Sequence, residues 1–293
     1  MPQRADATYS VLGYDRATGT FGGAVASCVP LDTVELVYAA TPAAAEARGA
    51  VMTQSYLLDG AQANAVDALG SGTTADEVVS ALIDPAYDAA FPLRQYAVVD
   101  ESGGITAFTG DGALAVATHR TFEVGTYVGS VQGNLLTDED VVLLASSAFA
   151  SAEHCGLGER LLRALEAAGE TPHGDSRCIV HGKPALAATL GLDAPTGQPV
   201  RLGVETAEDD GEHPVALLRV AFDSLGEDPC EPTEPPPNGS GGSGGSGGTG
   251  PQDETEAPGG CGVARVDGTS TIGAWGLALA IAWGLARTRG RDA

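Results

Sequence analysis

Basic side chains are scarce in this chain of 293 residues, which carries 15 of them against 39 acidic ones and has a formal charge of −24. Lys183 is the only lysine. Residues 1–230 alone hold 32 acids and 11 bases, a charge of −21. A surface of this kind repels phosphate backbones and anionic lipids. We therefore expect no nucleic-acid partner.

The common catalytic signatures are also missing. The sequence has no G-x-S-x-G elbow, no H-E-x-x-H motif and no G-x-x-x-x-G-K-[ST] loop. It has no C-x-x-C pair, and its five histidines lack the spacing of metal ligands. The acidic run at 208–212 is interpreted as a solvated loop, with weak calcium binding as the alternative. We expect no cofactor and no metal.

Residues able to build a core are absent from 231–260, where Gly, Ser, Pro and acids dominate. We predict a disordered linker over 226–262 and a separate segment over 263–293. Cys261 lies just ahead of that segment, which contains an apolar run at 272–286 and three arginines at 287, 289 and 291. An apolar helix followed by basic residues indicates a membrane anchor with a cytoplasmic end. A helix that docks on the domain is the alternative.

The order of cysteine, apolar helix and arginine cluster resembles the carboxy-terminal sorting signals of myxobacterial surface proteins. This resemblance implies that a sorting protease cuts near Cys261, that the cysteine is a lipid attachment point, and that the helix is removed. We therefore expect an exported protein anchored to a membrane or cell surface.

A hydrophobic export signal is not found in residues 1–7. Ala5-Asp6-Ala7 nevertheless fits the A-x-A pattern that precedes a signal-peptidase cut, which would make Thr8 the first residue. We interpret residues 1–7 as the remnant of a leader that starts upstream. A chance arrangement of alanines is the alternative.

Four cysteines remain when Cys261 is set aside, an even number that suits an oxidising compartment. Cys155 and Cys178 flank a predicted helix and are the pair we favour for a disulfide. Cys28 would then pair with Cys230. Buried free thiols are the alternative.

Residues 8–225 alternate between strand-like and helix-like segments and are predicted to form one domain. Strands are predicted at 8–14, 20–27, 34–40, 50–54, 94–100, 105–109, 114–118, 127–131, 177–181, 185–190 and 215–221. Helices are predicted at 57–69, 75–83, 138–150 and 158–168, with Thr73 or Thr74 capping the second. Strand pairs alternate with helix pairs in this order. It predicts an α+β fold with two mainly antiparallel sheets between two helical layers.

Several segments together resemble a bacterial and archaeal family, domain of unknown function 1028. They include Thr8-Tyr9-Ser10-Val11, Thr53-Gln54-Ser55, Val131-Gln132-Gly133-Asn134-Leu135 and Gly174-Asp175-Ser176-Arg177-Cys178. The resemblance covers roughly residues 8–221. It implies the αββα fold of N-terminal-nucleophile hydrolases, in agreement with the predicted element order. Some relatives carry a peptidoglycan-binding domain, where this chain has its predicted anchor.

An enzyme of that kind attacks with the side chain of its first residue and uses the free α-amine as the base. Thr8 is the candidate nucleophile, and a strand-opening threonine is the alternative. Gln132, Gly133 and Asn134 are candidates for stabilising the oxyanion, with an ordinary turn as the alternative. His119 with Arg120, and Asp175 with Arg177, are candidates for binding the substrate; structural ion pairs are the alternative for both.

Two functions are therefore predicted. The first is a surface-anchored amide or peptide hydrolase that acts on peptidoglycan peptides or other extracellular peptides. The second is an inert surface module that binds cell-wall or exopolymer ligands. One feature opposes activity: no lysine follows the nucleophile closely enough to tune its pKa, since Lys183 is far along the chain. The sequence predicts no oligomeric state.

Overall fold

The computed structural model describes residues 5–6, 8–208, 211–226 and 230. The predicted linker, Cys261, the apolar run and most of the predicted leader remnant lie outside these residues. The described strands are β1 (Ala5–Asp6), β2 (Thr8–Asp15), β3 (Thr20–Ser27), β4 (Tyr38–Ala40), β5 (Gly49–Tyr56), β6 (Arg94–Asp100), β7 (Ile105–Thr109), β8 (Thr118–Val124), β9 (Tyr127–Asn134), β10 (Ala187–Asp193) and β11 (Val200–Glu205). The described helices are α1 (Leu31–Val34), α2 (Ala61–Gly70), α3 (Ala75–Leu82), α4 (Asp140–Ser151), α5 (Leu157–Ala168) and α6 (Pro214–Asp223), with 3-10 turns η1 (Phe91–Leu93) and η2 (Ile179–His181).

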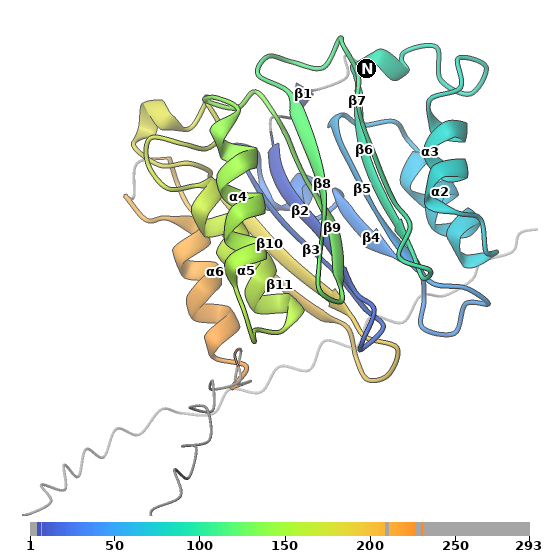
Figure 1. The fold of residues 1–293 in the computed structure, drawn as a ribbon. Coiled ribbons are helices and arrows are strands. Elements are labelled where there is room, and N and C mark those ends of the chain that lie inside the picture. Colours follow the sequence, from blue (N-terminus) through green and yellow to red (C-terminus); the bar gives the residue numbers. More distant parts are fainter. Residues whose placement is uncertain (1–4, 7, 209–210, 227–229, 231–293) are drawn as a thin grey trace, which may run out of the picture. The chain divides into compact units, whose positions relative to one another are not determined.

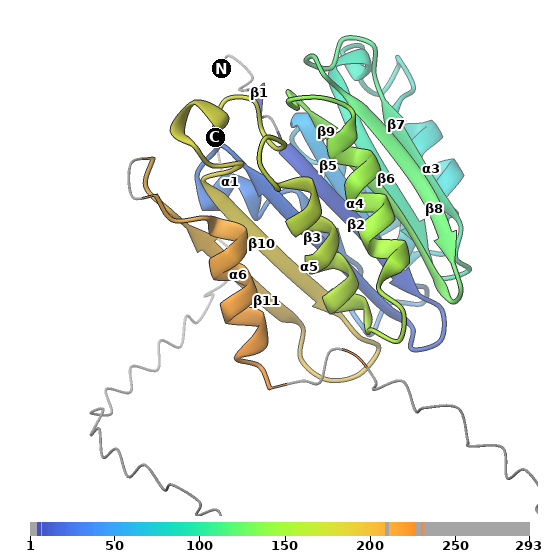
Figure 2. The ribbon, with the colours of Figure 1, turned by 60° about the vertical axis from the view of Figure 1, so that its left-hand side comes forward.

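Two antiparallel sheets form the centre of the domain. One has five strands in the order β1-β5-β6-β7, with β4 also paired to β5, and the other has six in the order β11-β10-β3-β2-β9-β8. Helices α4, α5 and α6 cover the outer face of the six-stranded sheet, while α2 and α3 cover the five-stranded sheet (Figures 1 and 2). The fold is therefore α+β, a four-layer αββα sandwich, as the sequence predicts.

Three apolar clusters fill the three interfaces between the layers. One lies between the six-stranded sheet and its helices, one between the sheets, and one between the five-stranded sheet and α2 and α3. Side chains alternate between the faces of a strand. On β2, Tyr9 and Val11 therefore face the helices, while Leu12 and Tyr14 face the other sheet. This alternation decides which polar side chains reach the layer between the sheets.

Local sequence explains the elements that match their predictions well. β2 and β3 are joined by a turn in which Asp15 accepts hydrogen bonds from the Ala17 backbone and the Thr18 hydroxyl, and Gly19 takes φ +70°. Thr74 begins α3 through a reciprocal capping box with Glu77. These signals involve residues only a few positions apart, so they can be seen in the sequence.

Three predicted strands need correction here, and one strand was missed. Only Tyr38–Ala40 of the strand predicted at 34–40 is extended, because Leu31–Val34 forms the short helix α1. Residues 114–117 are irregular, and the strand starts at Thr118 as the edge strand β8. The strand predicted at 177–181 is a hydrogen-bonded turn followed by the 3-10 turn η2. The strand β11 was not predicted at all.

The segment predicted as a strand at 215–221 is the helix α6. Its helical start has a local cause: His213 accepts a hydrogen bond from the Val215 backbone, and Pro214 occupies the first turn. Val215, Leu218 and Phe222 are buried at helical spacing. The β-branched content of the segment was the misleading signal.

The predicted disulfide pairing is wrong. Cys28 bonds to Cys178, and Cys155 bonds to Cys230. The first bridge joins the residue after β3 to the residue before η2, and the second joins the loop between α4 and α5 to Cys230, beyond α6. Cys155 and Cys178 are therefore each bonded to another cysteine and not to one another. The positions of cysteines along the sequence do not show which of them lie close enough in the fold to form a bond.

Candidate functional site

Thr8 opens β2 at one end of the layer between the sheets, the end beside β1 in Figure 1. Its register partners are Ser27 on β3 and Asn134 on β9. Thr8 shares the strand face of Leu12, so its side chain is directed toward the other sheet. The hydroxyl oxygen lies 3.5 Å from the Ser27 hydroxyl, and the residue is 1% exposed. We call this place the Thr8 end.

A network of buried polar side chains fills the layer next to the Thr8 end. Ser10, on β2, donates to Gln54 Oε1 at 2.6 Å, and Gln54 Nε2 donates to Gln95 Oε1 at 2.6 Å. Gln132 Nε2 donates to the Ser10 hydroxyl at 2.7 Å, and Asn134 Nδ2 donates to Gln95 Oε1 at 3.3 Å. These five residues, Ser10, Gln54, Gln95, Gln132 and Asn134, are at most 2% exposed and join the two sheets. We call them the amide network.

Two polar groups at this end lack a partner among the described residues. Asn134 Oδ1 and Ser55 Oγ are both buried without a hydrogen bond. Ser55 also adopts a left-handed backbone, with φ 73°, which costs a residue with a side chain conformational energy. Buried groups left unpaired in native proteins are rare, so each of these two needs a physical explanation.

The short strand β1 crosses over this end. Its residues Ala5 and Asp6 pair with Tyr56 and Ser55 of β5, in the five-stranded sheet. Thr8 starts β2 in the six-stranded sheet, so the chain passes from one sheet to the other between Asp6 and Thr8. In a chain that contains β1, the Thr8 nitrogen belongs to a peptide bond and cannot act as a base.

The three residues predicted to stabilise an oxyanion occupy different positions. The Gln132 side chain is held by Ser10, Ser130 and Met52, one step further into the layer than Thr8. Gly133 contributes its backbone carbonyl, which accepts from Gln95 Nε2 at 2.9 Å. Asn134 alone lies opposite Thr8, and its Nδ2 has a second hydrogen beyond the one directed at Gln95.

His119 and Arg120 do not face one ligand, because neighbouring residues of β8 point to opposite faces. His119 lies on the side of the layer between the sheets, where its Nδ1 is 2.8 Å from the Thr109 hydroxyl. Thr109 in turn accepts from Gln95, so it connects the exposed His119 to the amide network. Partial burial lowers the pKa of this imidazole. Arg120 lies on the face that packs against α4.

Asp175 and Arg177 form a bidentate ion pair, with Arg177 Nη2 2.9 Å from Asp175 Oδ2 and Nε 3.2 Å from Oδ1. Asp175 is fully buried and also accepts from the Cys28 backbone at 2.8 Å. Cys28 directly follows Ser27, the partner of Thr8, and is bonded to Cys178. The pair therefore holds the Thr8 end in place and leaves Asp175 no oxygen free.

Ser10, Ser27, Gln54, Ser55 and Gln95 were not predicted as site residues. Ser10, Ser27, Gln54 and Ser55 all lie in segments that carry the family resemblance, so a signal existed for these four. Gln95 looks like an ordinary polar position of a strand. Only the pairing of strands far apart in the sequence brings all of them together at Thr8.

No group of three or more His, Cys, Asp or Glu side chains within the described ranges could hold a metal ion. Lys183, buried at 3% exposure, donates to the Thr206 hydroxyl at 3.4 Å and to the Ala207 carbonyl. In the part of the chain that the structure describes, no helix is long and apolar enough to cross a bilayer.

Comparisons with known proteins identify relatives of the chain. The sequence model of a family of unknown function, DUF1028, matches residues 8–218. The crystal structure of protein SPO2555 from Silicibacter pomeroyi, also assigned to DUF1028, superposes with a TM-score of 0.57. It covers 75% of this chain and 90% of its own, at 23% identity, and so shows a shared fold. No curated protein is significantly similar in sequence.

Proposed function

Because the chain belongs to DUF1028, a family of unknown function, its activity must be argued from its own residues, and we propose an N-terminal-nucleophile hydrolase of amide or peptide bonds. The observation that carries the proposal is the position of Thr8. It starts a central strand, faces the layer between two sheets and lies opposite Asn134. The Ala5-Asp6-Ala7 sequence supplies a cleavage site directly before it.

The proposed chemistry begins when the bond between Ala7 and Thr8 is cut. The new α-amine, with an ordinary pKa of about 7.7–8.0, accepts the proton of the Thr8 hydroxyl as Oγ1 attacks the substrate carbonyl. The second Nδ2 hydrogen of Asn134 is the donor we assign to the resulting oxyanion. Collapse expels the amine, which leaves with the proton, and water then hydrolyses the Thr8 ester and restores the hydroxyl.

The proposed setting is outside the cytoplasm, at a membrane or cell surface, with cell-wall or other extracellular peptides as substrates. Two disulfides among the described residues support an oxidising compartment. Anchoring rests on the sequence of residues 226–293 alone, and a sorting protease would act at Cys261. The amide network gives the site a rigid floor, as a preorganised catalytic centre requires.

An inert surface module that binds ligands is the second candidate. The observations in its favour are the burial of Thr8 and the commitment of Lys183 to Thr206 and Ala207. Catalysis would then have to proceed without a lysine that tunes the nucleophile.

The first test is the amino terminus of protein exported from a host that carries the full upstream coding region. The hydrolase proposal expects Thr8 as residue one. A chain that starts at Thr8 is then incubated with a mixed peptide library, and products are identified by mass spectrometry. We expect hydrolysis that rises as the pH increases through about 8, since the amine must be neutral to act as the base.

The matched controls are the same trimmed chain with Thr8→Ala and with Thr8→Ser. Thr8→Ala should abolish hydrolysis, while Thr8→Ser, which keeps a hydroxyl, should retain part of it. Equal hydrolysis by the trimmed chain and its Thr8→Ala variant would refute the role of Thr8. A mature terminus upstream of Thr8 would favour the binding module.

A further inference from the structure

β1 occupies a short stretch of the edge of β5 that no other described strand covers. β6 pairs with one side of β5, from Gly49 to Ser55. On the other side β4 pairs only with Ala50 to Met52, and β1 pairs with Ser55 and Tyr56. Figure 1 shows β1 at the end of the sandwich where β2 begins. A chain without β1 would therefore expose this part of the edge.

Backbone groups of this edge point toward β1. The Thr53 N–H donates to the Val37 carbonyl on the same side of β5. Because N–H groups two residues apart in a strand point the same way, the Ser55 N–H is directed at Asp6, its register partner. In such an antiparallel pair the N–H of Asp6 points back at β5, whereas the N–H of Ala5 points away. The edge therefore holds a strand by its backbone, through the residue in the place of Asp6.

The end of β5 is held in place independently of β1. Arg94, which is 1% exposed, donates to the Tyr56 carbonyl at 2.8 Å and is paired with Asp88 at 2.7 Å. Its own backbone lies in β6, in register with Ser55. All three apolar clusters are built from residues 9–222. Loss of residues 1–7 should therefore leave both the fold and the edge intact, and a preformed edge costs a ligand little ordering.

The direction of β1 gives the direction of a strand that takes its place. β1 runs antiparallel to β5, and one residue, Ala7, stands between its end and Thr8. At about 3.3–3.6 Å per residue, the end of β1 lies within roughly 7 Å of the Thr8 Cα. A carbonyl in the place of Ala7 also lies near Thr8 Oγ1, because the nitrogen and Oγ1 of Thr8 are joined through only two carbons. The acyl half of a peptide attacked by Thr8 has to end at this place.

We propose that, once the bond before Thr8 is cut as the proposed function requires, the acyl half of an extended peptide substrate binds as an added strand on β5 at Ser55 and Tyr56, in the place of β1. Strand addition recognises the backbone of a peptide, so peptides of many sequences fit. The residue in the place of Asp6 must carry an N–H, and proline or an N-methylated residue is excluded there.

The test is a titration of residues 8–293 with acetyl-trialanine, followed through the amide NMR signals of Ser55 and Tyr56. Its free carboxylate stands in for the cleaved end, so Thr8 meets no bond to hydrolyse. We expect saturable shifts at millimolar peptide. N-methylation of the second alanine, in the place of Asp6, should weaken binding roughly tenfold or more, because it removes a donor and directs a methyl group at β5. N-methylation of the first alanine, in the place of Ala5, should have little effect.

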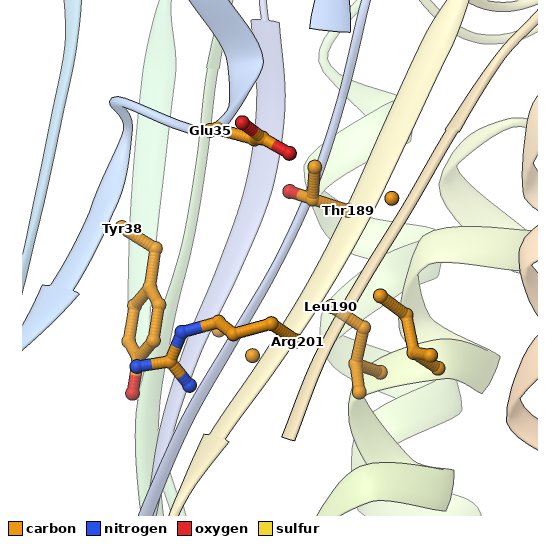
Figure 3. Close-up of a pocket in the computed structure, with 9 residues that line it drawn as sticks. Glu35, Tyr38, Thr189, Leu190 and Arg201 are labelled. Atoms are coloured by element: carbon orange, nitrogen blue, oxygen red, sulfur yellow. The ribbon is translucent and has the colours of Figure 1, made fainter. Parts of the chain in front are cut away.

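The intact 293-residue chain provides the controls on the protein. It should bind the peptide at least tenfold more weakly, because β1 occupies the edge. In this chain Asp6→Pro removes the N–H directed at β5 and should restore binding, whereas Ala5→Pro, the matched control, should not. These variants keep the test valid if the trimmed chain folds poorly. Glu35→Gln changes an exposed acid that lines a separate hollow over β10 and β11 (Figure 3) and should leave the affinity unchanged.

Three results would overturn the proposal. They are unchanged Ser55 and Tyr56 signals at 10 mM peptide, roughly ten times the dissociation constant of a weak millimolar site, equal binding of the two N-methylated peptides, and equal binding by the intact and trimmed chains. Binding with the expected N-methyl pattern by a chain that hydrolyses nothing would refute the hydrolase and leave the edge as a peptide site. Hydrolysis that needs Thr8 but tolerates both N-methylated substrates equally would keep the hydrolase and refute this binding mode.

Discussion

Gln95 joins more partners than any other residue of the amide network, so replacing it with alanine tests whether the network stabilises the domain. Its Oε1 accepts from Gln54 and Asn134, and its Nε2 lies within hydrogen-bond distance of Thr109 Oγ1, the Thr118 carbonyl and the Gly133 carbonyl. Gln95→Ala leaves two buried amide donors and a buried carbonyl without this partner. Each such group costs about 1–3 kcal/mol.

The expected loss of stability is about 3–9 kcal/mol, reduced if water enters the space that the side chain vacates. For a domain of this size each kcal/mol lowers the melting temperature by about 2–4 °C, so we expect a fall of roughly 10 °C or more. The loss of unfolding free energy is measured by urea unfolding followed by far-ultraviolet circular dichroism. Tryptophan fluorescence would not report on the domain, because both tryptophans, Trp275 and Trp283, lie outside residues 8–225.

Gln198→Ala is the matched control, since Gln198 is exposed and makes no hydrogen bond with a described residue. It should change stability by less than about 0.5 kcal/mol. A double-mutant cycle of Gln95→Ala with Asn134→Ala should be non-additive, because the two residues share a hydrogen bond. A Gln95→Ala cost below about 1 kcal/mol would refute the reasoning, since it would mean that the network is solvated or loosely held.

Two further predictions concern other buried links. Hydrogen bonding to Arg94 lowers the pKa of Asp88 below its ordinary 3.8, so this pair stabilises the fold above about pH 4 and loses its effect as the pH falls through the depressed value. Asp88→Asn should therefore cost about 3–5 kcal/mol at pH 7 and clearly less at pH 3; equal differences in urea midpoint at both would contradict this. Cys28→Ser opens a bridge that spans 150 residues and should cost about 2–4 kcal/mol. A calorimetric melting temperature within 2 °C of the parent's would oppose it, at ~2–4 °C per kcal/mol.

Sequence predicted the elements whose causes are local. The β2–β3 hairpin follows from turn residues at 15–19, and α3 follows from Thr74 and Glu77, which are three positions apart. The helix α6 was predicted as a strand because its β-branched residues outweighed the signal of His213 and Pro214 at its start. Edge strands such as β8 and β11 carry alternating exposed residues and read as loops.

In the candidate site too, some residues could be predicted from local sequence and others depend on the tertiary structure. Thr8 and Asn134 were chosen from separate segments, and the pairing of β2 with β9 places them opposite one another. Gln54 lies in a segment that carries the family resemblance, but neither its role nor that of Gln95 can be read from the sequence, because both depend on how the five-stranded sheet packs over the other. The predicted disulfide pairing was wrong for a related reason. Four cysteines allow three pairings, and only the folded chain distinguishes them.

The unsatisfied groups at the Thr8 end bear on the choice between the hydrolase and the binding module. Asn134 Oδ1 is opposite Thr8, and Ser55, with its unpaired hydroxyl and left-handed backbone, is opposite Asp6. Both therefore border the bond that the A-x-A pattern predicts to be cut. A peptide nitrogen at Thr8 has one hydrogen, whereas a free amine has at least two, so cleavage would add a donor at the residue opposite Asn134. An unpaired buried acceptor costs about 1–3 kcal/mol, so an amine hydrogen that reaches Asn134 Oδ1 would stabilise the cleaved domain, which favours cleavage and hence the hydrolase.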